Sequence, residues 1–431
     1  MLGSYGEVLR VPGALAFSAS GLIARLPMAL VGLGILLFTS GVTGSYGLAG
    51  VMSAAFSLSA AVGMIASSRL VDRLGQHKVL GWLVTGESLG LVLFILSMEL
   101  KLPFLVPAIF AAAAGLCSPA IGPAVRARWT FVIARAESTS SPKLRTAFAL
   151  ESISEEVIFT VGPLITAWLA ISVALPAPLI FAIVVGMTGT FVLIRLRTTE
   201  PTASPVRHAK EPHTFAFRHP GVFLMVFSAI ATGAIFGSFE VGIVAFTAEL
   251  GTPELSGVLL AAWALTSMFG GLWFGARHFR APLSRQLVAL TAALTVALLL
   301  TPFMTSLLAL SVVTMISGAL VAPVLITIFS LAERLVPNAQ LTEGLTYINS
   351  GLSVGFSLGV AVSGYAIDGW GTGFGFAVGV GAAGGAFLVA LLGQNRLRRS
   401  VRDYGPIPPT SALNAEPIPG PAPGGFAAEK G

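Results

Sequence analysis

Twelve apolar runs divide the chain, and short polar joints separate them. A helix that crosses the hydrocarbon layer needs about 20 consecutive apolar residues, so each run is long enough to span a lipid bilayer once. We predict helices at 14–38, 46–68, 79–98, 103–127, 147–172, 175–195, 220–248, 254–276, 286–302, 305–333, 343–367 and 373–393. The strands of a transmembrane β-barrel would be about ten residues long and of alternating character. The chain is therefore predicted to be an all-α integral membrane protein.

The composition excludes a soluble globular protein. Of the 431 residues, 55% are hydrophobic and only 10% are charged, and the mean hydropathy is +0.87, whereas soluble domains carry about 25% charged residues. The single cysteine, Cys117, cannot form a disulfide within the chain. The net charge of +6 does not indicate a nucleic-acid partner, because the basic residues lie at the ends of the predicted spans.

Lysine and arginine are distributed unevenly between the two sides of the predicted membrane. Of these 25 residues, 23 lie near the termini or in the joints that follow even-numbered spans. Lys101 lies in an odd-numbered joint, and Arg25 lies inside the first span. Because positively charged joints stay in the cytoplasm, we expect a multi-pass protein of the cytoplasmic (plasma) membrane with both termini in the cytoplasm.

One hairpin occurs twice. The run from Gly50 to Ser68 matches Gly257 to Gly275 at a constant offset, and each copy ends in a basic turn. A duplicated chain is common among secondary transporters. We therefore predict an N-terminal six-helix bundle and a C-terminal one, joined by a cytoplasmic loop and followed by a disordered tail rich in Pro, Gly and Ala. The boundaries are 1–195 and 220–395 for the bundles, 196–219 for the loop and 396–431 for the tail.

The turn after the second span carries a resemblance to a known family. Its sequence from Ser68 to Lys78, Ser-Arg-Leu-Val-Asp-Arg-Leu-Gly-Gln-His-Lys, is similar to the pattern Gly-x-Leu-Ala-Asp-Arg-x-Gly-Arg-Arg of the major facilitator superfamily. It departs from this pattern at Ser68, Gln76 and His77. Six spans, a basic loop and six further spans extend the resemblance over nearly the whole chain. The resemblance implies two pseudo-symmetric six-helix bundles around a solute site reached by alternating access.

The resemblance also implies a conformational latch on the cytoplasmic side. In the family, the aspartate of this turn caps the start of the eleventh helix, where a carboxylate is favoured, and joins a charge cluster with basic residues that end the fourth span. The alternative is an ordinary basic turn that only sets the topology. The positions that match are Asp72, Arg73, Gly75 and Lys78, with Arg126 and Arg128 as the candidates from the fourth span.

A Gly-Pro pair in the fifth span, Gly162-Pro163, resembles a motif of the drug antiporters of this superfamily. Glycine and proline together permit a local bend and close approach of helices. A second pair, Gly122-Pro123, occurs in the fourth span. The resemblance implies an efflux-like branch of the family, in which neighbouring bent helices would rock.

Charged residues inside the predicted spans are the candidates for ion coupling. Such residues cost at least about 2.5–3.5 kcal/mol at the centre of a bilayer and usually face a cavity or a partner. Arg25 in the first span lies at a depth comparable to that of Glu155 and Glu156 in the fifth, and Glu151 shares the face of Glu155. We expect one of Glu155 and Glu156 to pair with Arg25 and the other to be desolvated and to exchange a proton. The alternative is a fixed ion pair that holds the two spans together.

Three other polar positions are candidates for the solute cavity. Glu240 lies in the outer part of the seventh span, where it would attract a cation or an amine, or would bond to a serine or a backbone group. Tyr347 and Asn349 near the start of the eleventh span correspond, in the repeat, to Ser152 and Ser154 of the fifth. The segment 126–145 is predicted to be an interfacial helix with solvated charges.

The sequence contains none of the motifs of a soluble or intramembrane enzyme. It has no phosphate-binding Gly-x-x-x-x-Gly-Lys-Ser/Thr loop and no Cys/His cluster, so we expect no enzymatic activity, no cofactor and no metal site. The predicted function is proton-coupled efflux of a small molecule, a drug-like compound or metabolite, by a monomer. One alternative is proton-coupled transport of a sugar or other polar metabolite. Another is a non-transporting scaffold or receptor, which would need folded parts outside the membrane that the short joints do not provide.

Overall fold

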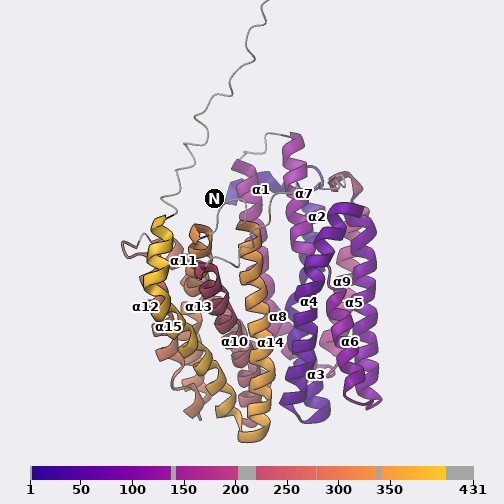
Figure 1. The fold of residues 1–431 in the computed structure, drawn as a ribbon. Helices are drawn as coiled ribbons and strands as arrows, with labels where there is room; N and C mark the ends of the chain where they lie inside the picture. The colour runs from indigo at the N-terminus through magenta and orange to yellow at the C-terminus, as the bar shows by residue number, and fades with distance from the viewer. Residues whose placement is uncertain (1, 137–141, 202–219, 278, 336–340, 404–431) are drawn as a thin grey trace, which may run out of the picture.

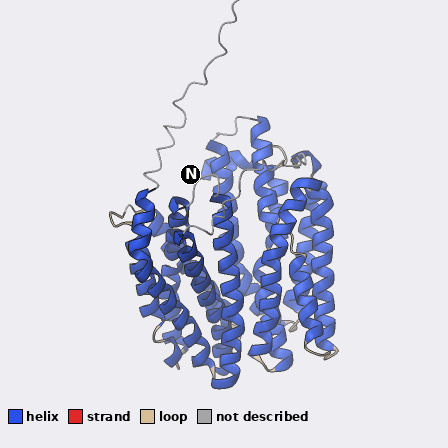
Figure 2. Ribbon diagram, viewed as in Figure 1, coloured by secondary structure: helices blue, strands red, loops and turns tan. Residues whose placement is uncertain are grey.

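The computed structural model describes residues 2–136, 142–201, 220–277, 279–335 and 341–403. These residues form helices and short connections, with no strand among them (Figure 2). Within this part of the chain, 12 segments are long and apolar enough to cross a membrane. Most of the predicted central loop and of the predicted tail lies outside the described residues.

The first half of the chain contains six spans preceded by a short helix. The helices are α1 (Leu2–Leu9), α2 (Ala14–Arg25), α3 (Pro27–Thr43), α4 (Tyr46–Leu74), α5 (Gln76–Glu99), α6 (Leu105–Leu116), α7 (Ile121–Ala136), α8 (Pro142–Ser172) and α9 (Ala177–Arg195). A short 3-10 turn, η1 (Arg197–Thr199), follows.

The second half contains six further spans. They are formed by α10 (Pro220–Glu249), α11 (Leu255–Gly275), α12 (Leu283–Leu298) with the 3-10 turn η3 (Thr301–Phe303), α13 (Leu307–Leu335), α14 (Leu341–Trp370) and α15 (Thr372–Asp403). The last helix extends to Asp403, into the segment that was predicted to begin the tail at 396.

Two of the spans in the first half are broken helices, although one continuous helix was predicted for each. The first span is interrupted at Leu26, between α2 and α3, although the backbone of Leu26 keeps helical dihedral angles (φ −51°, ψ −40°), and Pro27 opens α3. The fourth breaks between Leu116 and Ile121. Proline lacks the N–H that an uninterrupted helix would use. Pro27 explains the interruption of the first span, and Pro119, which lies between Leu116 and Ile121, explains the break of the fourth. Pro163, by contrast, lies inside the unbroken α8.

The twelve spans form two bundles side by side (Figure 1). Helices α2–α9 make the N-terminal bundle, drawn from indigo to magenta, and α10–α15 make the C-terminal bundle. We call the end that carries α1 and the last turns of α15 the terminal face. We call the opposite end, where α3 joins α4 and α14 joins α15, the far face (Figure 1).

Glycines mediate the close contacts between the bundles. A Cβ atom on Gly50 of α4 would lie 2.6 Å from the carbonyl oxygen of Val360 in α14, and a Cβ atom on Gly257 of α11 would lie 2.6 Å from that of Pro163 in α8. Only glycine permits two backbones to approach so closely. Gly50 and Gly257 are the equivalent first residues of the repeated hairpin, so the repeat read from the sequence has a structural counterpart. Both contacts lie toward the far face.

The apolar core reflects the same arrangement. One buried cluster fills the C-terminal bundle and includes Leu33, Leu36 and Leu37 of α3. Two other clusters fill the terminal and the far part of the N-terminal bundle. The two bundles therefore share apolar core near the far face, and the polar site described next lies in the terminal half of the N-terminal bundle.

Candidate functional site

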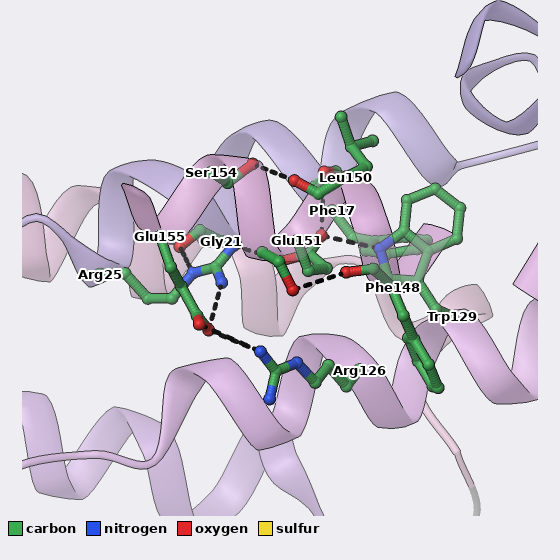
Figure 3. A network of polar contacts seen from close by, with 12 residues as sticks. Phe17, Gly21, Arg25, Arg126, Trp129, Phe148, Leu150, Glu151, Ser154 and Glu155 are labelled. Carbon is green, nitrogen blue, oxygen red and sulfur yellow. Dashed lines mark hydrogen bonds and ion pairs between the residues drawn. The ribbon is translucent and has the colours of Figure 1, made fainter. Parts of the chain in front are cut away.

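Glu151 of α8 is a fully buried carboxylate with partners from two other helices. It forms an ion pair with Arg25, the last residue of α2 (Figure 3). The indole Nε1 of Trp129 in α7 donates to its Oε1 at 2.8 Å, and Ser18 of α2 donates to the same atom at 3.3 Å. These bonds satisfy both carboxylate oxygens, as the burial of a charge requires.

Glu155 lies one turn farther along α8 and is shared by two guanidinium groups. Arg25 lies 3.4 Å from its Oε1, and Arg126 of α7 lies 3.0 Å and 3.1 Å from its two oxygens (Figure 3). Glu155 is 30% exposed and Arg126 is 41% exposed, whereas Arg25 and Glu151 are buried. Two arginines and two glutamates make a neutral network with a buried part and an accessible part.

The guanidinium of Arg25 lies at the end of α2. Its side chain bonds back to its own helix, with Nε donating to Gly21 O at 3.1 Å. Gly122, in the first turn of α7, lies beside both charges: a Cβ atom there would make ordinary van der Waals contacts, 3.5 Å from Glu155 Oε1 and 3.9 Å from Arg25 Cδ. The Gly-Pro pair noted in the fourth span thus borders the network.

Glu156, the neighbour of Glu155 in sequence, lies in a different environment. It is exposed, and it makes no ion pair or hydrogen bond with the described residues. On α8 it shares a helical stripe with Pro163 and Ala167, at seven and eleven residues, and both of these contact Gly257 of α11. Glu156 therefore faces the opposite bundle, on the terminal side of the contact that joins the bundles. Of the two carboxylates, Glu155 is the one that lies near Arg25.

The structure does not bring the proposed latch residues together. Asp72, Arg73 and Lys78 are exposed, and within the described chain Asp72 has no ion pair with Arg126 or Arg128. Arg126 is engaged by Glu155. Gly75 has a φ of +90° between α4 and α5, a backbone conformation that suits glycine.

Arg128 is buried inside the N-terminal bundle. Its Nε donates to Gln76 Oε1 at 2.7 Å, and its NH1 donates to Leu196 O at 2.9 Å and to Thr199 at 2.8 Å. It therefore ties the turn after α4 to the end of α9. Trp129 beside it is fully buried, with its ring 4.6 Å from that of Phe17.

The prediction of an interfacial helix at 126–145 is wrong. This segment begins as the terminal half of the fourth span, in α7, and residues 137–141 lie outside the described chain. The basic residues Arg126 and Arg128 suggested a solvated surface, but their carboxylate and carbonyl partners come from distant segments that the local sequence does not reveal.

The remaining candidates lie on other faces. Asn349 of α14 is exposed, and its amide bonds to Leu345 O of its own helix at 3.0 Å. It lies eleven residues before Val360, on the stripe of α14 that contacts Gly50 of the other bundle. Tyr347 is half-buried. Gly162 packs against Ala29 of α3, which brings the first and fifth spans close together.

A polar contact at the far face was missed by the sequence analysis. Asp368, near the end of α14, accepts hydrogen bonds from Ser45 Oγ at 2.6 Å and from the backbone N–H groups of Tyr46 and Gly47 at 2.8 Å each. It thus caps the first turn of α4 from the opposite bundle. A serine before an apolar run is a usual helix start, but nothing local to Asp368 indicates this partner.

Another polar contact involves Glu87 of α5. Ser118, in the gap between α6 and α7, donates to its Oε1 at 2.7 Å. The broken fourth span is thereby attached to the third. The residues that the structure describes contain no group of His, Cys, Asp and Glu side chains suited to hold a metal ion.

The comparisons with known proteins agree with this architecture. The sequence model of the Major Facilitator Superfamily matches residues 14–305. No curated protein matches the sequence. Among solved structures, the chain is similar to a mutant of the nucleoside transporter NupG, with 14% sequence identity and a TM-score of 0.66 over 89% of this chain and 99% of that one.

Two further solved structures have the same fold. The peptide transporter POT in complex with sulfate has 13% identity and a TM-score of 0.64, over 91% of this chain and 95% of that one. A bacterial homologue of the iron transporter ferroportin in an inward-facing state has 15% identity and a TM-score of 0.64, over 89% and 99% of the two chains. At such identities the likeness concerns the fold alone.

Proposed function

Because the chain belongs to the major facilitator superfamily, and is therefore a transporter and not an enzyme, we propose that it exports a small solute in exchange for protons. The observation that carries the proposal is the charge network in the terminal half of the N-terminal bundle. Charged residues inside a membrane protein mark solute or proton paths. Here they lie where two spans are broken, and broken spans border the central site of many transporters.

We assign the terminal face to the cytoplasm. The excess of lysine and arginine in the joints at this face supports the assignment. The bundles make their close glycine contacts toward the far face, whereas Asp72, Glu156 and Asn349 are exposed toward the terminal face. This arrangement supports a state that is open to the cytoplasm and closed at the far face, in which the latch of Asp72 is released. One of the similar structures is likewise described as inward-facing.

Within the network, we assign a fixed part and a moving part. The pair of Arg25 and Glu151 is buried and bonded to Trp129 and Ser18, so it holds the first, fourth and fifth spans together. Glu155 and Glu156 are accessible and are the candidates for proton exchange.

Protonation of Glu155 would remove the counter-ion that Arg25 and Arg126 share. The charged groups around it are Arg25 from α2, Arg126 from α7, and Glu151 and Glu156 from α8. Without its charge, the two guanidinium groups would repel each other, and Arg126, the accessible one, would be released. Glu156 would then be the next carboxylate available to it. A proton on Glu155 would thus change the contact between α7 and α8.

Two observations support efflux of a drug-like compound or metabolite. One is the resemblance of Gly162-Pro163 to the motif of drug antiporters, and the other is the apolar character of the side chains between the bundles. Leu33, Leu36 and Leu37 are among these side chains, next to α10. An apolar lining of this kind, exposed when the bundles separate, would favour a solute with an apolar part.

The test uses purified protein in proteoliposomes with an imposed pH gradient and a panel of drug-like compounds, nucleosides, peptides and sugars. We expect the gradient to drive movement of at least one solute, with proton movement that depends on that solute. In Glu155→Gln, Glu156→Gln and the double variant, gradient-driven movement should fall while exchange of solute without a gradient remains. Glu99→Gln, an exposed carboxylate at the far end of α5, is the matched control.

Two results would contradict the proposal. One is that no solute of the panel moves and no proton movement follows solute addition. The other is that gradient-driven transport is unchanged in all three variants, which would leave the network a purely structural role.

A further inference from the structure

The segment 276–285, which links α11 to α12, is basic and contains no acidic residue. It carries Arg277, Arg280 and, in the first turn of α12, Arg285. All three side chains are exposed, and none forms an ion pair with a carboxylate of the described chain. We call this segment the second basic turn. It lies at the terminal face, because α11 begins at the far face and runs to the opposite end of the bundle (Figure 1).

The repeated hairpin shows how this turn differs from its first copy. At the constant offset of the repeat, Arg280 corresponds to Arg73, whereas Phe279 takes the place of Asp72. The second copy therefore keeps a basic residue and has an aromatic ring where the first copy has a carboxylate. A turn that only set the topology would need its cations, and the ring would have no purpose in it.

The acidic side chains described in the C-terminal bundle lie elsewhere. Glu240 is half-buried within α10, and its Oε1 is inaccessible and has no hydrogen-bond partner among the described residues. Glu333 is exposed at the end of α13, next to Arg334 in the sequence. Three others lie at the far face: Glu249, Glu254 and Asp368. The positive charge of the second basic turn is therefore not neutralised by the side chains described around it.

Aromatic rings hold the turn against α11. Phe279 stacks on Phe274, with ring centroids 4.8 Å apart, and its ring lies 6.1 Å from that of Trp273. The guanidinium carbon of Arg277 lies 4.7 Å from the centroid of the Trp273 ring. Such a contact stabilises the cation without a carboxylate. The N–H groups in the plane of the guanidinium remain directed outward, where they can bind an anion.

The residues of α11 that precede the turn are ordered by depth. Phe269, Trp273 and Arg277 follow one another at intervals of four residues, so they lie along one side of α11. This side is exposed, whereas α8 packs against Gly257 and α13 against Gly270. An exposed phenylalanine inside a span contacts acyl chains, a tryptophan near its end lies at the interface, and an arginine beyond it reaches the headgroups. The order matches that of a phospholipid, from its chains to its phosphate.

We propose that the second basic turn binds an anionic phospholipid of the phosphatidylglycerol type, with its arginines as counter-ions of the phosphate and with Phe269 and Trp273 against an acyl chain. Basic residues at a membrane surface attract anionic lipids, and the planar guanidinium bonds to phosphate through two N–H groups. Because Phe279 replaces the acid of the first copy, no carboxylate of the turn competes with the phosphate. The inference concerns the lipid and does not depend on proton-coupled transport.

The experiment measures lipid binding to the full purified chain in a neutral detergent. Phosphatidylglycerol and phosphatidylcholine with identical acyl chains are titrated separately, and native mass spectrometry gives the dissociation constant of the first lipid bound. We expect phosphatidylglycerol to bind at least about tenfold more tightly. Equal dissociation constants would overturn the proposal without any variant. Inorganic phosphate at the same concentration should not displace the lipid, and displacement would indicate a site for a free anion and contradict a lipid site.

Variants locate the site, with a matched control from the other bundle. Arg135 at the end of α7 is exposed, and its guanidinium carbon lies 5.5 Å from the centroid of the Phe131 ring. Arg135→Gln and Arg277→Gln therefore each remove one guanidinium that lies over a ring. We expect Arg277→Gln to weaken binding of phosphatidylglycerol by about fivefold, the effect of one basic residue at an anionic surface, and Arg135→Gln to leave it unchanged. The triple variant Arg277→Gln/Arg280→Gln/Arg285→Gln should abolish the preference for this lipid.

Two results with variants would overturn the proposal. One is an unchanged preference in the triple variant. The other is equal weakening by Arg135→Gln and Arg277→Gln, which would assign the preference to the overall charge of the protein. If the triple variant does not fold, the comparison of these two single variants decides. Transport is not measured, so a failure of the proposed function would leave the lipid site standing, and a failure of the lipid site would leave the proposed function standing.

Discussion

Glu151 is the residue on which the N-terminal charge network depends most, because it is the buried carboxylate and has partners on two other helices, α2 and α7. Its neighbours on α8, Glu155 and Glu156, have the same side chain and different surroundings. Glu151 is inaccessible and fully bonded, Glu155 is shared between two arginines, and Glu156 has no partner among the described residues. Chemically identical residues within two turns are therefore expected to respond differently to the same substitution.

We predict that Glu151→Gln destabilises the protein by about 3–5 kcal/mol, because it leaves the charge of Arg25 buried with a weaker partner. The measurement is thermal unfolding of the purified protein. Glu156→Gln should unfold at nearly the temperature of the unaltered protein. The double variant Arg25→Met/Glu151→Leu should recover most of the lost stability, since it removes both charges. A single variant as stable as the unaltered protein would show that the pair is not structural.

We predict that Trp129→Phe lowers the free energy of unfolding by about 1.5–3 kcal/mol, the range for a hydrogen bond to a charged group. The variant keeps an aromatic ring against Phe17 and removes the N–H that donates to Glu151. Trp82→Phe is the control, because Trp82 is 80% exposed. Equal stability of the two variants would contradict a bonding role for the indole.

At the scale of helices, the contacts between α4 and α14 join the two bundles toward the far face. Gly50 permits the backbones to touch, and Asp368 places a carboxylate on the first turn of α4, where the helix dipole favours it. These contacts join elements of opposite bundles and do not stabilise either bundle alone. Their loss should therefore change the population of states more than the stability of the fold.

We predict that Asp368→Asn opens the far face. The substitution removes charge-assisted hydrogen bonds worth about 1.5–3 kcal/mol each. The rate at which a membrane-impermeant maleimide labels a cysteine at position 360 should therefore rise by at least about tenfold. The labelling is measured in a Val360→Cys variant that also carries Cys117→Ser. Val360 is fully buried against Gly50. Glu254→Gln is the control, since Glu254 is exposed at the same face. Equal labelling in both variants would show that Asp368 does not hold this face closed.

At the scale of the whole molecule, the basic joints and the helix directions together predict which face of the protein lies in the cytoplasm, and this orientation can be measured. The chain enters the first span and leaves the last span at the terminal face, because the number of spans, 12, is even. The far face carries Lys101, in the connection between α5 and α6.

We predict that fluorescent-protein fusions at the C-terminus are fluorescent and that alkaline phosphatase inserted after Lys101 is active. The first reporter matures in the cytoplasm and the second outside it, so this result follows from the positive-inside distribution. Phosphatase inserted near residue 140 should be inactive. The reverse pattern would assign the terminal face to the exterior and would invert the proposed direction of opening.

The number and the order of the spans could be predicted from the sequence because they depend on local properties. The length of an apolar run and the charges that flank it are fixed along the chain, and a helix needs no distant partner to satisfy its backbone in lipid. The repeat also lies in the sequence, and Gly50 and Gly257 could be matched before their contacts were known.

The tertiary structure decided which charges meet. The rotation of each helix placed Glu151 and Glu155, and not Glu156, toward Arg25, so that one guanidinium meets both carboxylates. Asp368 and Trp129 found partners more than twenty residues away. Such contacts depend on how separate helices pack against one another. The hydrophobic pattern that determines the spans carries almost no information about this packing.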